Sequence, residues 1–79
     1  MKFVYFATRG TGDPTAASIP LHMAANGSLE VGHEVAVVLA GDGAEIVLGD
    51  NAQTIEGVGV PPLRDLLEKL SAGGATVFV

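Results

Sequence analysis

Apolar residues gather in three short, uninterrupted runs along the chain. The first run, KFVYFAT, spans residues 2–8, and the second, HEVAVVLA, spans residues 33–40. The third, ATVFV, occupies residues 75–79 directly after the Gly73–Gly74 pair. A continuous apolar run is typical of a strand that is covered on both faces, as in a parallel sheet. We therefore predict three buried parallel strands.

The segment between the first two runs carries the signals of a helix. Asp13 is placed to cap the first free N–H groups, and Pro14 suits the first helical position because its missing N–H is not needed there. We expect this helix to bend at Pro20 and to continue to Val31. Gly32 is then its left-handed C-terminal cap.

Helical signals of different strength occur in the second half of the chain. The GDG sequence at residues 41–43 predicts a tight turn, followed by a short helix over 44–50 and a loop over 51–62. Residues 62–73, PLRDLLEKLSAG, predict an amphipathic helix. The Asn26–Gly27 pair in the first helix is also compatible with a turn, although apolar residues keep the helical spacing across it.

The order strand, helix, strand, helix, helix, strand predicts an α/β fold with a parallel sheet and right-handed crossovers. The chain has 79 residues and no internal repeat or linker, so we expect one domain, residues 1–79. Three strands make a thin sheet. We therefore expect these residues to form the N-terminal two-thirds of a five-stranded domain.

Composition narrows the classes of function. Nine acidic residues against four scattered Lys and Arg give a net charge of −5, which disfavours direct binding to nucleic acid. The apolar run at the N-terminus is too short for a signal sequence or a membrane span, so we expect a cytoplasmic protein that does not insert into membranes. A short chain that is 48% hydrophobic is expected to bury apolar surface against further copies of itself. The interaction hypothesis centres on TVFV, which needs cover from another subunit or else lies at an exposed edge.

The chain contains no cysteine and two histidines. The absence of cysteine removes disulfides, thiolate metal sites and thiol chemistry from these residues, and we expect no metal and no cofactor. Ser18 and His22 have the spacing of neighbours on a helix, but no acid completes a triad, so no catalytic residue is assigned. Packing is the expected role of His22 and His33. The remaining acids are interpreted as a solvated surface: Glu30, Glu34, Glu45, Asp50 and Glu56.

The carboxyl ends of the first two strands are expected to share one rim of the sheet, where parallel α/β proteins bind ligands. TRGTGDP follows the first strand, but it lacks the GxGxxG spacing and the GK[ST] motif. A connecting loop with an Asp cap is therefore favoured over a phosphate loop, and a nucleotide-binding flavodoxin-like module is the weaker alternative. Asp42 is likewise explained as a helix cap. The candidate rim, expected to accept a small anionic ligand, comprises Thr8, Arg9, Gly10, Thr11, Asp13, Gly41, Asp42 and Gly43.

Three longer motifs carry a resemblance to a known family. They are DPTxAxxPxHxAANxxxExGHEV, LAGD and GVGxPPLxxLLxK, and together they span most of the chain. In these motifs the chain resembles the DsrE/DsrF-like proteins. The resemblance implies a Rossmann-like three-layer sandwich with five parallel strands and assembly into trimers or hexamers. In sulfur-relay members it also implies a persulfide-carrying cysteine after the strand that corresponds to TVFV, and no position of this sequence matches that cysteine.

These residues leave two functional hypotheses. In the first, the protein belongs to a sulfur relay and exchanges persulfide sulfur with a partner protein, using a cysteine from beyond Val79 or from a partner chain. In the second, it is a non-catalytic homo-oligomeric module that binds a partner or an anionic ligand at the rim. Because these 79 residues lack a thiol, they are not a competent sulfurtransferase by themselves, and the assignment as an enzyme stays open.

Overall fold

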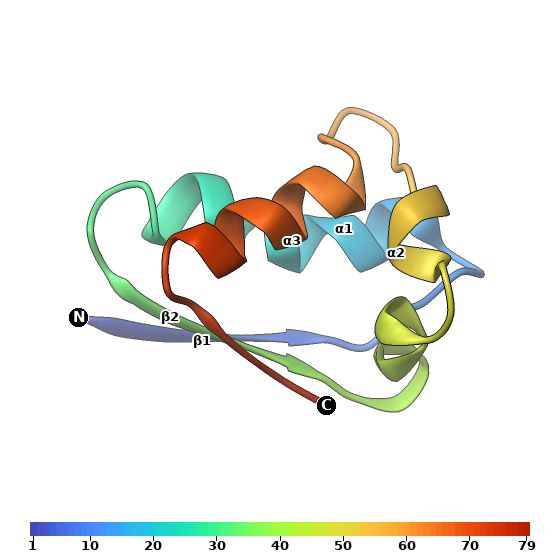
Figure 1. Ribbon diagram of the computed structural model, residues 1–79, viewed down its shortest axis with the longest axis horizontal. Helices are drawn as coiled ribbons and strands as arrows, with labels where there is room; N and C mark the ends of the chain where they lie inside the picture. The colour runs from blue at the N-terminus through green and yellow to red at the C-terminus, as the bar shows by residue number, and fades with distance from the viewer.

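The computed structural model describes residues 1–79 and shows one three-stranded sheet beneath a layer of helices (Figure 1). The strands pair in the order β1-β2-β3 and are all parallel, so β2 lies in the centre and the other two form the edges. This arrangement confirms the α/β class predicted from the sequence. The strands are β1 (Lys2–Ala7), β2 (Glu34–Leu39) and β3 (Thr76–Phe78).

Five helical elements connect and cover the strands. Two are not regular α-helices: η1 is a π-helix that continues α1, and η2 is a 3₁₀-helix that begins one residue after the end of β2. No helix in the structure is long and apolar enough to cross a membrane. The elements are α1 (Pro14–Met23), η1 (Ala24–Ser28), η2 (Gly41–Val47), α2 (Asn51–Thr54) and α3 (Leu63–Ala72).

The start of α1 and the left-handed conformation of Gly32 are both confirmed, but Gly32 is not the helix cap, because that position is held by Leu29. The Asp13 carboxylate accepts a hydrogen bond from the Ala16 N–H at 3.1 Å, and Gly32 has a φ angle of 89°. The helix does continue through Asn26–Gly27, so the alternative of a turn there is wrong. The helix ends at Ser28 rather than Val31. Its last part is a π-helix, in which the Leu29 N–H donates to the Ala24 carbonyl at 2.9 Å.

Two boundaries in the middle of the chain differ from the prediction. The 3₁₀-helix η2 already begins at Gly41, whose φ of 57° lets the chain turn sharply out of β2, so GDG is the first turn of the helix. The expected loop over 51–62 begins with the short helix α2, because the Asn51 side-chain amide donates to the Glu45 carbonyl at 2.7 Å and joins α2 to η2. Helix α3 matches its prediction to within one residue at each end.

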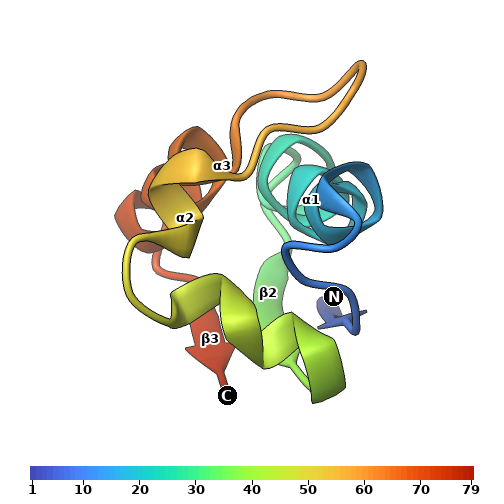
Figure 2. The ribbon, with the colours of Figure 1, turned by 90° about the vertical axis from the view of Figure 1, so that its right-hand side faces the viewer.

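The hydrophobic core lies entirely between the sheet and the helices. Val37, in the centre of β2, is fully buried and belongs to the same core cluster as Leu21 of α1 and Leu70 of α3. On the opposite face of the sheet no helix lies over the strands (Figure 2). There, Phe6 of β1 is 62% exposed and Phe78 of β3 is 54% exposed.

The expectation that every strand is covered on both faces is therefore wrong for β1 and β3, and TVFV lies at an exposed edge. The physical reason is the strand order. Both crossovers step in the same direction across the sheet, and two right-handed crossovers that do so place their helices on the same face. Of the three layers that the family resemblance implies, these residues provide the sheet and one helical layer.

Candidate functional site

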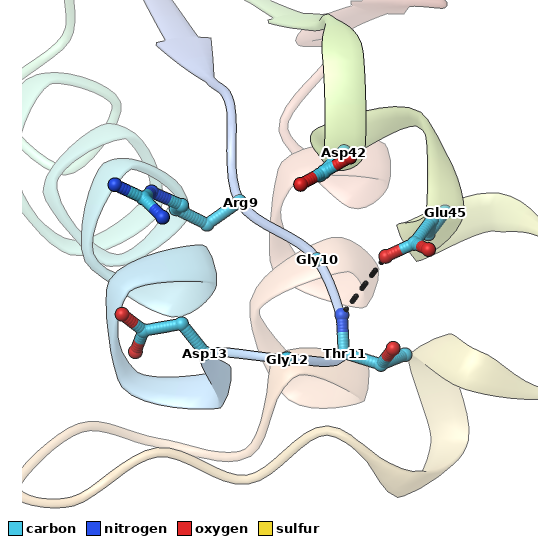
Figure 3. A pocket seen from close by; sticks show the side chains of 7 residues that line it. All are labelled: Arg9, Gly10, Thr11, Gly12, Asp13, Asp42 and Glu45. Atoms are coloured by element: carbon cyan, nitrogen blue, oxygen red, sulfur yellow. Dashed lines mark hydrogen bonds between the residues drawn. The ribbon is translucent and has the colours of Figure 1, made fainter.

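A polar hollow of about 410 Å³ opens at the carboxyl ends of β1 and β2 (Figure 3). The loop from β1 to α1 forms one wall, and the 3₁₀-helix η2 forms the other. None of the lining residues is hydrophobic. They are Arg9, Gly10, Thr11, Gly12, Asp13, Asp42 and Glu45.

The loop wall is a compact turn that leads into α1. The Asp13 N–H donates to the Gly10 carbonyl at 3.1 Å, and the Asp13 carboxylate caps the helix at Ala16. Asp13 therefore has a structural role, because one of its oxygens satisfies a backbone N–H that the helix leaves free. The carboxylate still contributes its negative charge to the hollow.

The second wall depends on a glycine that the packing requires. Gly43 is buried against the end of β1, and a Cβ atom at this position would overlap the Ala7 carbonyl. Hydrogen bonds from the Ala40 N–H to the Ala7 carbonyl (3.0 Å) and from the Gly43 N–H to the Ala40 carbonyl (2.9 Å) hold the start of η2 on this strand end. Residues three apart on a 3₁₀-helix lie one above the other, which brings Asp42 and Glu45 to the same side.

The two walls touch at Gly10 and Thr11. The Thr11 N–H donates to a Glu45 carboxylate oxygen at 3.3 Å, as the dashed line in Figure 3 shows. A Cβ atom on Gly10 would overlap this carboxylate and the Asp42 carbonyl, so only glycine allows such a close approach. The hollow is therefore a built feature of the fold, with Glu45 as the link between its walls.

The hollow has an excess of negative charge. It contains three carboxylates (Asp13, Asp42 and Glu45) and one guanidinium. Arg9 lies on the α1 side, away from the acids of η2 (Figure 3), and it forms no ion pair. The other three cations of the chain are each paired with a glutamate elsewhere on the surface. This balance attracts a positively charged group and repels an anion.

The structure brings together most of the rim residues predicted from the sequence, since Arg9, Gly10, Thr11, Asp13 and Asp42 all line the hollow. Thr8, Gly41 and Gly43 adjoin it without lining it. Sequence reasoning missed Gly12 and Glu45. Glu45 is among the acids interpreted as solvated surface, because these acids are spread over different elements and no pair of them stands out in the sequence.

The two histidines lie outside this site. The Ser18 hydroxyl donates to the Pro14 carbonyl at 2.8 Å, while His22 is hydrogen-bonded through Nδ1 to the Asn26 side chain at 3.0 Å, so no Ser–His pair forms. The His33 ring packs against Phe3 with 5.1 Å between ring centroids. No cluster of three or more His, Cys, Asp or Glu side chains in the structure is arranged to hold a metal ion.

Comparison with known proteins gives one match. The family model of the DsrE/DsrF-like family matches residues 1–79. No curated protein and no solved structure matches the chain. The match spans both walls of the hollow and all three strands.

Proposed function

Since the chain belongs to the DsrE/DsrF-like family, we propose that these 79 residues act in a sulfur relay as a binding module and do not themselves carry the sulfur. The observation that carries the proposal is that the family match covers all 79 residues and none of them is a cysteine. A persulfide is carried on a thiolate, and the hydroxyls of Ser and Thr do not replace it. Sulfur is then carried by a thiol that these residues do not contain.

The polar hollow is the proposed binding site, and its charge favours a basic group of a partner protein. Asp42 and Glu45 offer carboxylate oxygens from one wall, and Asp13 adds a third carboxylate from the other. A guanidinium matches such acceptors because it donates several N–H groups in a plane. Because carboxylates outnumber cations in the hollow, we propose a cationic ligand here instead of the anionic ligand expected from the sequence.

A peptide titration followed by amide NMR tests this proposal. We expect a tetra-arginine peptide to shift the amide signals of residues 10–13 and 42–45, while a tetra-glutamate peptide leaves them unchanged. The Glu45→Gln variant keeps the acceptor for Thr11 but loses the charge, and it should weaken binding about two- to fivefold, as expected for an exposed ion pair.

The matched control is Asp65→Asn, which removes a carboxylate from the exposed face of α3, outside the hollow. This variant should bind the arginine peptide as the wild type does. If Asp65→Asn and Glu45→Gln weaken binding equally, the peptide senses only the net charge of the chain and the hollow is not a site. If the glutamate peptide shifts the same amide signals, the result would instead support the anionic ligand expected from the sequence.

A further inference from the structure

The only Asn–Gly pair of the chain, Asn26–Gly27, lies inside the π-helix η1. A Cβ atom on Gly27 would meet nothing within 4 Å, and the φ angle of Gly27 is not positive. Neither packing nor backbone conformation therefore requires glycine at this position. Glycine inside a helix is also less stable than alanine. The pair thus carries a cost that the fold of these residues does not explain.

Asparagine followed by glycine is the dipeptide in which an asparagine side chain most readily loses ammonia. The backbone nitrogen of the glycine attacks Cγ of the asparagine, and no side chain on the glycine hinders the approach. Asn26 and Gly27 are both exposed, so solvent water reaches them. The other asparagine, Asn51, is followed by alanine and donates from a partly buried side chain to the Glu45 carbonyl. Asn51 is therefore an internal comparison.

The Asn26 side chain is held at both ends of its amide. Its Nδ2 donates to His22 Nδ1 at 3.0 Å, and its Oδ1 accepts from Nζ of Lys69, which also pairs with Glu30. Lysine has no acceptor, so Lys69 fixes which end of the amide carries the oxygen. Because His22 lies one helical turn before Asn26, the amide points back along the helix and not towards the Gly27 nitrogen.

The backbone of η1 also opposes the attack. The Gly27 nitrogen reaches Cγ of Asn26 only when Asn26 leaves its helical conformation, because the two atoms must close a five-membered ring. The π-helix η1 is a five-residue segment at the C-terminal end of α1. Such segments are rare and frequently occur at functional sites, and helix ends fray. Opening of η1 is therefore the step that brings the reacting atoms together.

We propose that Asn26 is a site of spontaneous deamidation and that its contact with Lys69 slows the reaction. The Gly27 nitrogen forms a bond to Cγ of Asn26 while the bond from Cγ to Nδ2 breaks. The side-chain nitrogen leaves as ammonia, with the proton of the Gly27 amide. Water then opens the cyclic imide and leaves aspartate or isoaspartate at position 26. No oxidant, reductant or cofactor takes part.

The product changes the contact between η1 and α3. An aspartate at position 26 lies one helical turn before Glu30, where like charges repel, and Lys69 then balances two carboxylates in place of one. Isoaspartate also adds one carbon atom to the backbone, which interrupts the regular hydrogen bonds of a helix. We therefore expect the modification to loosen the end of α1 from α3.

Mass spectrometry of protein aged in mildly alkaline buffer tests the proposal. Cleavage after glutamate places Asn26 in residues 1–30 and Asn51 in residues 46–56, so the change in mass is assigned to one site. We expect Asn26 of the folded wild type to deamidate at least fivefold faster than Asn51. Gly27→Ala should slow the reaction at Asn26 at least fivefold, because alanine hinders the attack and stabilises the helix.

Lys69→Met separates the effect of the Lys69 contact from that of the dipeptide. Methionine keeps an unbranched side chain but donates no hydrogen bond, so Asn26 should deamidate about two- to fivefold faster, as expected for the loss of one exposed charged contact. The matched control is Glu68→Gln on the exposed side of α3, because no hydrogen bond or ion pair joins Glu68 to Asn26. This control should leave the rate unchanged.

Three results would overturn the proposal. The first is an unmodified Asn26 in the folded chain after a time in which the urea-unfolded chain is fully deamidated there. The second is the same rate at Asn26 in the wild type and in Lys69→Met, since the contact would then restrain nothing. The third is an equal rise at Asn51 in Lys69→Met, which would mean that the variant loosens the whole fold. These rates are independent of the peptide titration.

Discussion

Both faces of the sheet carry large apolar side chains, but their surroundings are very different. On the face beneath the helices, Val37 and Leu39 are almost fully inaccessible to solvent, while on the other face Phe6 and Phe78 remain more than half exposed. Both sets come from the same apolar runs. Burial in this chain therefore depends on where the crossovers place the helices, and not on the hydrophobicity of each strand alone.

The largest loss of stability is expected between the sheet and the helices that cover it. Leu66 of α3 is 1% exposed, so Leu66→Ala leaves a cavity in the core and should lower the free energy of unfolding by about 2–5 kcal/mol. Chemical denaturation monitored by circular dichroism measures it. The adjacent Leu67→Ala removes a side chain that is only partly buried and should cost clearly less. Equal losses would mean that α3 does not pack as described.

A smaller loss is expected where η2 meets β1, at the base of the polar hollow. Gly43→Ala forces a methyl group against the Ala7 carbonyl, and the shift that relieves the overlap should cost about 1–3 kcal/mol. Thermal unfolding measures the loss. Gly12→Ala is the control, because a Cβ atom there meets nothing within 4 Å and its φ angle is not positive. A fully stable Gly43→Ala variant would place η2 farther from the strand end.

The smallest effect is predicted on the open face. Phe78→Lys replaces a solvent-exposed side chain with a charged one. It should change the free energy of unfolding by no more than about 0.5 kcal/mol. Val77→Lys, one residue earlier, points the charge towards the core that Val77 packs against and should destabilise the fold clearly. Denaturation of both variants at low concentration compares them. A large loss for Phe78→Lys would show that the open face is covered.

Local signals in the sequence predicted most of the fold. The three apolar runs became three parallel strands, Asp13 caps α1, and Gly32 has the left-handed conformation. Each of these features depends on residues that are close together in the chain. The spacing of the leucines also predicted α3, because spacing alone determines which residues share one face of a helix.

The candidate site could be predicted only in part, because it is assembled from two segments. The loop after β1 and the turn after β2 were expected at one rim, and both line the hollow or adjoin it. Glu45 was missed because its place depends on the register of a 3₁₀-helix that packs on β1 through Gly43. Its carboxylate, which meets the Thr11 N–H, adds a third negative charge to a rim that already contains Asp13, Asp42 and Arg9.

The amino-acid order alone thus determines the type and approximate position of each element, since hydrophobic period, capping residues and glycines act over a few residues. The uncovered face of the sheet and the acidic hollow arise only when the elements are packed together. Strand order determines both, because it sets which face both crossovers cover and which strand ends lie side by side. That order depends on contacts between residues far apart in the chain, which no local pattern encodes.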